Sequence, residues 1–259
     1  MKTLTALILL FGLHNTCLPQ ETIRITNGEW EPFLSEYSYE YGLDSHIVSE
    51  AFKLEDIDVI WGFFPWIRAY QLAKKGTEWD ASCCWWPAKE SKDAFKLSTA
   101  ISNTSFVFFH LKTNQFDWEN LNDLSNLKIG GTLEYDYGKN FMSAIKNEQI
   151  NVELVPTDEK NFKKLLHNRI DIFPNDPIVG KAQIRNNLPP EKAKLITHHP
   201  KKFELTTLHL IISNNTKKQQ FFLDKFHSGL NKLKQSGQLD QMLKDLDNGK
   251  YDKKQRKWK

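Results

Sequence analysis

Few residues of this chain are capable of covalent chemistry. Cys83 and Cys84 are adjacent, and neighbouring cysteines form a disulfide only through a strained eight-membered ring. Two interpretations stay open: a pair of half-buried thiols on a strand, or a vicinal disulfide formed in an oxidising compartment. A metal site is not expected, since no other Cys or His lies nearby at ligand spacing.

The chain also contains no recognisable motif for acid–base or nucleophilic catalysis. The chain has no nucleophile elbow, no HExxH, no phosphate-cradling glycine loop and no CxxC. Its histidines are spread along the chain, and a single histidine is more often structural or exposed than catalytic. We therefore expect a protein that is not an enzyme and that carries no cofactor and no metal.

The composition is that of a folded protein. Hydrophobic residues make up 40% and charged residues 26% of the 259 residues. The formal charge of +3 is nearly neutral for this length, which argues against a nucleic-acid surface. No later run of about eighteen apolar residues follows the N-terminal one, so we expect the mature chain to be soluble.

The N-terminus reads as a secretory signal. Lys2 precedes an apolar stretch from Leu4 to Leu13, which is too short to span a bilayer because spanning needs about twenty residues. We place a signal peptide at residues 1–20 and expect a periplasmic protein, whose formal charge falls from +3 to +2 with the loss of Lys2. The alternatives are a buried first strand or helix and, less well supported by the residues before it, lipidation at Cys17.

Strand-like and helix-like segments alternate after residue 20, which predicts an α/β fold. Strands are expected at 22–26, 57–64, 106–111, 128–131, 152–155, 170–173, 195–198 and 205–213. Helices are expected at 43–52, 65–75, 137–147, 158–168, from about 176, at 217–235 and at 239–246. Asp44 or Ser45 is the expected N-cap of the first helix, and Gly76 should end the second. The two long apolar strands, 106–111 and 205–213, bracket the middle unit.

Short motifs follow one another in a characteristic order. They are NGEWEPF at 27–33, YGLD at 41–44, PWIRA at 65–69, LSTA at 97–100, LKIG at 127–130, YDYG at 135–138 and RIDIFPND at 169–176. Their order and spacing resemble those of the bacterial periplasmic solute-binding proteins of family 3, the polar amino acid type that serves ABC transporters. The resemblance runs over nearly the whole mature chain.

This resemblance implies a two-lobed, periplasmic-binding-protein-like (type II) α/β fold with two hinge-crossing strands. Lobe 1 would comprise 21–112 and 206–259, and lobe 2 would comprise 113–205. A small polar ligand, amino-acid-like or an amine, would bind between the lobes, which close by a hinge motion. The expected protein is a monomer whose partner is an ABC permease or a membrane sensor.

By the same resemblance, most of the ligand-facing residues are aromatic or acidic. We expect them to be Trp30, Phe33, Trp66, Arg68, Trp85, Trp86, Ser91, Tyr135, Asp136 and Asp176. Trp85 and Trp86 are adjacent on a strand, so one should face the cleft and the other the core. Plain alternatives are core packing for Trp30 and Phe33, a solvated helix position for Arg68, and a helix N-cap for Asp176.

One position departs from the family pattern. The arginine that grips an α-carboxylate in amino acid binders falls on Ser91 here, with Ala88 replacing a threonine. A charge-assisted hydrogen bond contributes about 1.5–3 kcal/mol, so its loss weakens carboxylate binding about tenfold to hundredfold. Lys89 or Lys92 would compensate only as a point charge. An ordinary α-amino acid is therefore not the expected ligand. Asp136 would repel an anion, and Glu134 stands where the family usually has glycine, so an amine or sugar-like ligand suits this acidic, aromatic wall better than a carboxylate.

Two other functions stay open. Some members of this fold are dehydratases. Dehydratase activity would require an acid–base pair in the cleft, and an activity assay on the purified protein tests it. The closed form would alternatively report to a membrane sensor. Neighbouring permease and ATPase genes would favour transport, and a neighbouring sensor gene would favour signalling.

Overall fold

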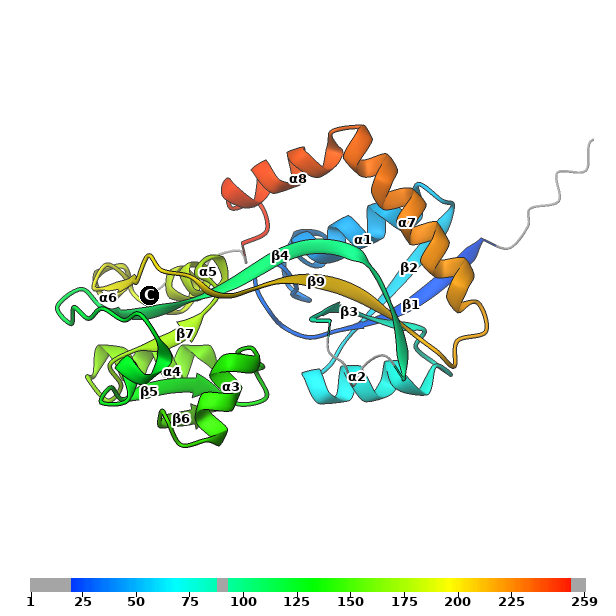
Figure 1. Ribbon diagram of the computed structural model, residues 1–259. Coiled ribbons are helices and arrows are strands. Elements are labelled where there is room, and N and C mark those ends of the chain that lie inside the picture. Colours follow the sequence, from blue (N-terminus) through cyan, green and yellow to red (C-terminus); the bar gives the residue numbers. More distant parts are fainter. Residues whose placement is uncertain (1–19, 88–92, 253–259) are drawn as a thin grey trace, which may run out of the picture.

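The computed structural model describes residues 20–87 and 93–252, which form two α/β lobes (Figure 1). One lobe contains β1 (Glu21–Asn27), η1 (Tyr39–Tyr41), α1 (Leu43–Lys53), β2 (Ile57–Phe63), α2 (Trp66–Lys75), β3 (Ala81–Trp85), α7 (Gln219–Gln235) and α8 (Gln238–Asp247). The other contains η3 (Leu121–Leu124), β5 (Ile129–Thr132), α3 (Lys139–Lys146), β6 (Val152–Val155), α4 (Asp158–Leu166), β7 (Phe173–Asn175), α5 (Pro177–Asn187), α6 (Pro190–Ala193) and β8 (Ile196–His198).

Two strands, β4 (Phe95–Leu111) and β9 (Phe203–Ser213), run side by side from one lobe to the other (Figure 1). They are antiparallel and pair from Phe95 with Ser213 to Phe106 with Phe203. On one side β9 also pairs with β3, giving the order β2-β1-β3-β9-β4-β7, and the last residues of β4 pair with β7 and β8. The expected α/β fold with two hinge-crossing strands is confirmed.

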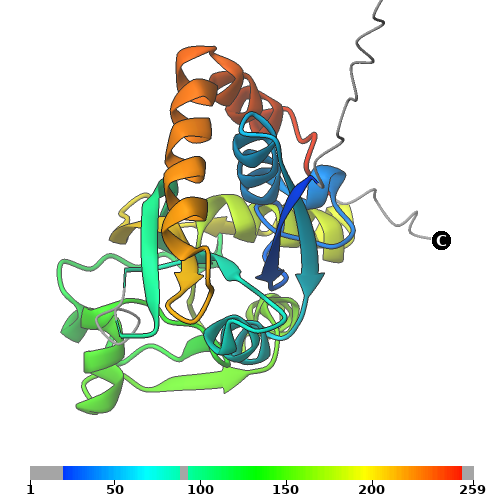
Figure 2. The ribbon, with the colours of Figure 1, turned by 90° about the vertical axis from the view of Figure 1, so that its right-hand side faces the viewer.

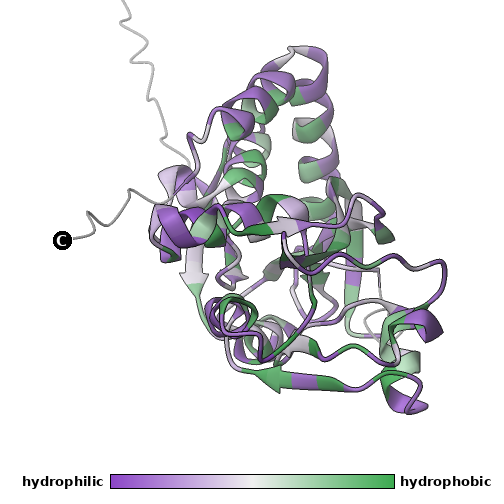
Figure 3. Cartoon of the chain, turned by 90° about the vertical axis from the view of Figure 1, so that its left-hand side faces the viewer, coloured by the Kyte–Doolittle hydropathy of each residue, from purple (hydrophilic) through white to green (hydrophobic). Residues whose placement is uncertain are grey.

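Each lobe has its own hydrophobic core. Ile23, Ile47 and Phe226 are fully buried in the core of the first lobe, where α1 and α7 lie side by side (Figure 2). In the second lobe, Phe108 and Phe109 of β4 point to opposite faces and enter two separate clusters, as adjacent strand residues should. The helices carry both polar and apolar residues along their length (Figure 3), which is typical of helices that bury one face.

Most element ends follow local signals, but the expected N-cap of α1 is wrong. Gly76 ends α2 in the left-handed conformation (φ 64°), as predicted. At α1 the N-cap is Gly42, and both Asp44 and Ser45 lie buried in the first turn. Their side chains serve tertiary partners instead, since the Asn27 amide donates to Ser45 Oγ at 2.9 Å.

Two strands have bounds that differ from those predicted from the hydrophobic periodicity. β4 begins at Phe95 instead of residue 106, because its mixed polar and apolar first half is held by pairing with β9, a partner distant in sequence. β7 lies at Phe173–Asn175 instead of 170–173, where it pairs with β4. The lobe boundaries at 112/113 and 205/206 stay a prediction; Val179 of α5 packs with the core of the first lobe.

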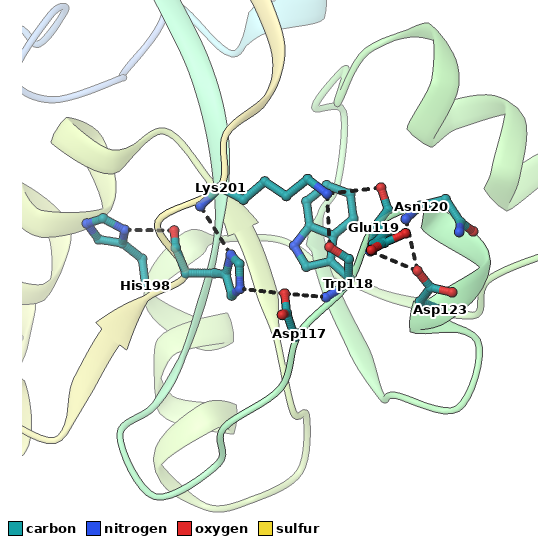
Figure 4. Close-up of polar contacts among 8 residues, drawn as sticks. Asp117, Trp118, Glu119, Asn120, Asp123, His198 and Lys201 are labelled. Atoms are coloured by element: carbon teal, nitrogen blue, oxygen red, sulfur yellow. Dashed lines mark hydrogen bonds and ion pairs between the residues drawn. The ribbon is translucent and has the colours of Figure 1, made fainter.

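Lys201, just before β9, hydrogen-bonds the loop of the second lobe that contains Trp118 and Glu119 (Figure 4). Its Nζ donates to the carbonyl oxygens of Trp118 at 2.9 Å and Glu119 at 3.0 Å, and lies 4.4 Å from the Trp118 ring centre. Its backbone N–H donates to Nδ1 of His199, whose Nε2 lies 3.4 Å from Asp117. One lysine thus connects the loop after β4 to the segment that leads into β9.

Replacing Lys201 with methionine should lower the free energy of unfolding by about 1 kcal/mol. The change keeps most of the apolar stem but removes two charge-assisted hydrogen bonds and an exposed cation–π contact, and solvent screening reduces all three. Urea denaturation would measure it. Lys202→Met, one residue along and also exposed, is the control and should stay within about 0.5 kcal/mol of the natural chain. Equal stability of both variants would contradict this role of Lys201.

Candidate functional site

A cavity of about 330 Å³ lies between the lobes. Its walls come from β3, α2 and the loop after β1 on one side and from the loop after β5 on the other. The lining residues are Trp30, Trp66, Tyr70, Cys84, Trp85, Trp86, Phe106, Glu134, Tyr135, Asp136 and Leu208. The structure therefore brings six of the ten expected site residues to one cavity: Trp30, Trp66, Trp85, Trp86, Tyr135 and Asp136.

Helix α2 sets the aromatic wall. Pro65 is its N-cap, and Trp66 and Tyr70 lie one turn apart, where residues i and i+4 share a helix face. Both rings meet Trp85 edge-on, with ring centres 5.4 Å and 5.2 Å away. Edge-to-face packing fixes the three rings against each other and leaves their remaining faces as a wall of the cavity.

Trp85 and Trp86 both line the cavity, and each also packs against a core cluster, so the two rings are not divided between cleft and core as expected. The physical cause is an irregularity in β3. Cys84 has a positive φ of 66°, and the pairing of β3 with β9 shifts register between Ser82 and Trp85. Such a bulge interrupts the alternation of side chains between the two faces of a strand.

The loop after β5 supplies the acidic side of the cavity. Glu134 is exposed and has a positive φ of 67°. Asp136 Oδ1 accepts a hydrogen bond from the Gly138 N–H at 2.9 Å, which holds the turn before α3. The Tyr135 hydroxyl donates to Asp158 Oδ2 at 3.3 Å, and burial raises the pKa of Tyr135 well above its ordinary value.

A second hollow of about 720 Å³ shares Trp66, Glu134 and Tyr135 with the first. Six of its lining residues are acidic: Glu29, Glu31, Glu36, Glu134, Asp158 and Glu159. Within the described part of the chain, no Lys, Arg or His lines either hollow. An acidic cleft with apolar walls focuses a negative potential, which raises the local concentration of cations.

Not every carboxyl of the cleft is free to bind. Asp158 is buried and accepts hydrogen bonds from Thr132 Oγ1 at 2.5 Å and Asn175 Nδ2 at 3.1 Å. Burial raises its pKa, although these donors oppose the shift. Asp158 therefore holds the second lobe together, and the exposed Glu134 and Asp136 are the better candidates for contact with a ligand.

Of the other four expected site residues, the three that the structure describes do not line this cavity. Phe33 is buried and stacks on Trp30 with ring centres 5.0 Å apart, so it supports the wall from behind. Arg68 is exposed, and its guanidinium lies 5.2 Å from the Phe64 ring centre. Ser91 lies outside the described residues.

Asp176 is only 2% exposed and lines neither hollow. It caps α5, accepting from the N–H groups of Ile178 at 2.7 Å and Val179 at 3.1 Å, and from Thr104 Oγ1 at 2.9 Å. Burial raises its pKa. Asp176 is thus the N-cap of α5, as the alternative interpretation expected, and its contact with a ligand stays a prediction.

Five lining residues were absent from the sequence-based expectation: Tyr70, Cys84, Phe106, Glu134 and Leu208. Tyr70 had a usable signal, because it lies four residues after Trp66 on the same helix. Glu134 is the neighbour of an expected residue. Phe106 and Leu208 come from the crossing strands, and their place in the wall depends on how the lobes meet.

The fold of this chain is similar to that of several solved structures. A histidine kinase sensor domain with similarity to periplasmic binding proteins matches with a TM-score of 0.71 and 13% identity, covering 88% of this chain and 96% of that one. A mutant of an arginine-binding protein from T. maritima matches with a TM-score of 0.69 and 14% identity, covering 88% of this chain and 95% of that one. An amino acid ABC transporter substrate-binding protein from Streptococcus pneumoniae, bound to L-arginine, matches with a TM-score of 0.68 and 15% identity. The match covers 89% of this chain and 96% of that one.

The chain has the periplasmic-binding-protein fold. No protein-family model and no curated protein matches the sequence. At identities this low the likeness establishes the fold and leaves the ligand open. None of the described helices is both long and apolar enough to cross a membrane. Nor do three or more His, Cys, Asp or Glu side chains among the described residues come together as a metal site.

Behind the cavity of this periplasmic-binding-protein fold lies a buried carboxyl, Asp44. Its Oδ2 accepts from Ser102 Oγ of β4 at 2.8 Å and from Cys84 Sγ at 3.2 Å, while its Oδ1 has no partner among the described residues. Burial raises its pKa to about 7, against the opposing effect of the two donors. Asp44 thus connects α1, the cavity wall and a hinge-crossing strand.

The raised pKa of Asp44 predicts a pH-dependent stability. Between its unfolded value near 4 and about 7 the folded state binds more protons than the unfolded state, so the free energy of unfolding falls as pH rises. From pH 5 to pH 7, the natural chain should lose about 2 kcal/mol relative to Asp44→Asn, which cannot titrate. Urea denaturation at several pH values measures the difference. Asp247→Asn, the same change at an exposed position, is the control variant. Parallel profiles for Asp44→Asn would contradict the prediction.

Proposed function

We propose that this protein is an extracytoplasmic solute-binding protein that captures a small organic cation between its lobes and performs no chemistry on it. The observation that carries the proposal is the cavity whose aromatic wall belongs to one lobe and whose acidic loop belongs to the other. A ligand there touches both lobes at once, as hinge-type capture requires.

The lining favours a positively charged ligand. A cation over the faces of Trp66, Trp85 or Trp86 gains cation–π attraction of about 0.5–2 kcal/mol per ring, more as water is excluded. Glu134 and Asp136 add direct charge attraction. An α-carboxylate would find no cationic partner among the described lining residues. This supports an amine, and it makes an ordinary α-amino acid or a neutral sugar a poorer fit.

Capture would follow from a shift between open and closed forms. Contacts to Tyr135 and to Trp66 are made together only when the lobes approach, so a ligand stabilises closure by its difference in affinity for the two forms. The strands β4 and β9 carry the connection between the lobes. The closed protein would then be read by an ABC permease or a membrane sensor.

Location and assembly follow the same proposal. A signal peptide at residues 1–20 would deliver the chain to the periplasm, where it would act as a monomer. A dehydratase on this fold is the less favoured alternative, since the similar structures reported above are binding or sensor proteins by description.

The ligand class is tested by differential scanning fluorimetry with matched pairs of probes. Agmatine and L-arginine share a guanidinium but differ in the carboxylate, and choline and 3,3-dimethylbutanol share a shape but differ in charge. We expect the melting temperature to rise with agmatine or choline and not with their partners. A response confined to acidic amino acids or to neutral polyols would overturn the ligand class.

Closure is tested separately by small-angle X-ray scattering. The radius of gyration should fall when a binding probe is added, because the lobes approach across the cavity. Binding of a probe without compaction would overturn capture by closure.

A further inference from the structure

The adjacent thiols of Cys83 and Cys84 have a setting that ligand capture does not require. Both side chains are buried and free, and their Sγ atoms lie 2.8 Å apart. Cys83 belongs to the core of the first lobe, whereas Cys84 also lines the cavity. The pair therefore joins the protein interior to the space into which small molecules enter.

The backbone conformation brings the two thiols together. In a regular strand, neighbouring side chains point to opposite faces, and their sulfurs would lie far apart. Here Cys84 has a φ of 66°, a conformation that costs a residue with a side chain about 1–3 kcal/mol. The same irregularity turns both following tryptophans to the cavity. Strain of this kind persists where the surrounding structure holds it in place.

A proton acceptor lies next to the pair. Cys84 Sγ donates to Asp44 Oδ2 at 3.2 Å, and Ser102 Oγ donates to the same oxygen at 2.8 Å. Burial raises the pKa of both thiols, which makes them slow to ionise by loss of a proton to water. A carboxylate in hydrogen-bond contact gives the Cys84 proton somewhere to go.

We propose that Cys83 and Cys84 form a reversible dithiol–disulfide site in the wall of the ligand cavity, oxidised by small disulfide compounds that enter through the cavity. Asp44 takes the Cys84 proton, and the thiolate attacks one sulfur of the small disulfide. A mixed disulfide forms, and one small thiolate leaves and takes up the proton held by Asp44 to become a thiol. Cys83 Sγ then loses its proton to solvent and attacks Cys84 Sγ, and the second small thiolate leaves and takes up a proton from solvent.

This exchange oxidises two protein thiols and reduces one small disulfide to two thiols. It also removes the S–H donor that Cys84 gives to Asp44. Trp85 and Trp86 follow directly in the chain and line the cavity, so a new bond at Cys84 displaces the aromatic wall. We expect the oxidised protein to bind a cavity ligand at least threefold more weakly; this coupling rests on the proposed function, whereas the oxidation does not.

The oxidation is tested on the reduced full-length chain with oxidised glutathione, followed by peptide mass mapping. The peptide with both cysteines should lose two hydrogen atoms, and dithiothreitol should restore them. Cys83→Ser should stop at the mixed glutathione adduct on Cys84. A glutathione adduct on Cys17 alone, or no reaction under native conditions, would overturn the site.

A second test uses the natural chain alone and so does not depend on the folding of the serine variant. Phenylarsine oxide bridges two neighbouring thiols, so the natural chain should gain one arsenical on the peptide that contains Cys83 and Cys84. Absence of that adduct in the folded natural chain would overturn the proposal. With agmatine or choline as the probe, equal affinity of the oxidised and reduced forms would overturn the coupling alone. If no cation binds but the disulfide forms, the proposed function fails and the thiol site stands.

Discussion

Replacing Glu134 with lysine should lower the affinity for an organic cation about thirtyfold. Glu134 lines both hollows from the loop after β5, so the change inverts a charge at the point where they meet. Charges about 4 Å apart interact by about 1 kcal/mol in water and by more near a protein surface. A reversal of two units therefore costs about 2 kcal/mol, which corresponds to a factor of about thirty.

The chain offers a matched control for this substitution. Glu148 is also an exposed glutamate of the second lobe with positive φ, 55° against 67° for Glu134, but it lines neither hollow. Isothermal titration with agmatine or choline should show the loss for Glu134→Lys and nearly natural affinity for Glu148→Lys. Equal affinities of the two variants would contradict a ligand-facing role for Glu134.

Replacing Gly229 with valine should lower the free energy of unfolding by at least about 3 kcal/mol. Gly229 lies on α7, where it packs against α1, and a Cβ placed there would be 1.8 Å from the carbonyl oxygen of Ala51. That atom belongs to the backbone and cannot turn aside, so the two helices must separate. Overpacking of this kind typically costs about 1–3 kcal/mol and sometimes more.

Helix propensity predicts the opposite sign, which makes the test decisive. Valine is favoured over glycine in an exposed helix by a few tenths of a kcal/mol, and alanine by about 1 kcal/mol. Gly229→Ala should nevertheless be destabilising, and Gly229→Val more so, in urea denaturation. Asn231→Val, at an exposed position of the same helix, should change stability by less than about 0.5 kcal/mol. A gain in stability at residue 229 would show that α1 and α7 do not pack this closely.

Local patterns predicted most of the elements because their causes are local. Apolar spacing located α1 and α7, and the proline before Trp66 and the glycine at 76 marked the ends of α2. The first half of β4 had no such signal. Its mixed residues become a strand only because β9, more than ninety residues later, supplies the hydrogen-bonding partner.

The aromatic character of the cavity was also predictable, since Trp30, Trp66, Trp85 and Trp86 stood in motifs with a recognisable order. What local reasoning did not predict is that Trp85 and Trp86 both line the cavity. Strand alternation is a property of a regular backbone, and the register shift at Cys84 depends on the pairing of β3 with β9.

The sequence by itself determined the α/β class, the two crossing strands and the aromatic residues that line the cavity. The tertiary structure alone decided that Asp44 is a buried carboxyl and not a helix cap, that Asp176 is buried outside both hollows, and that Glu134 joins the tryptophans. The reason is physical. Periodicity and capping act within a few residues of chain, whereas burial, pKa shifts and the charge of a cleft arise from groups that only folding brings together.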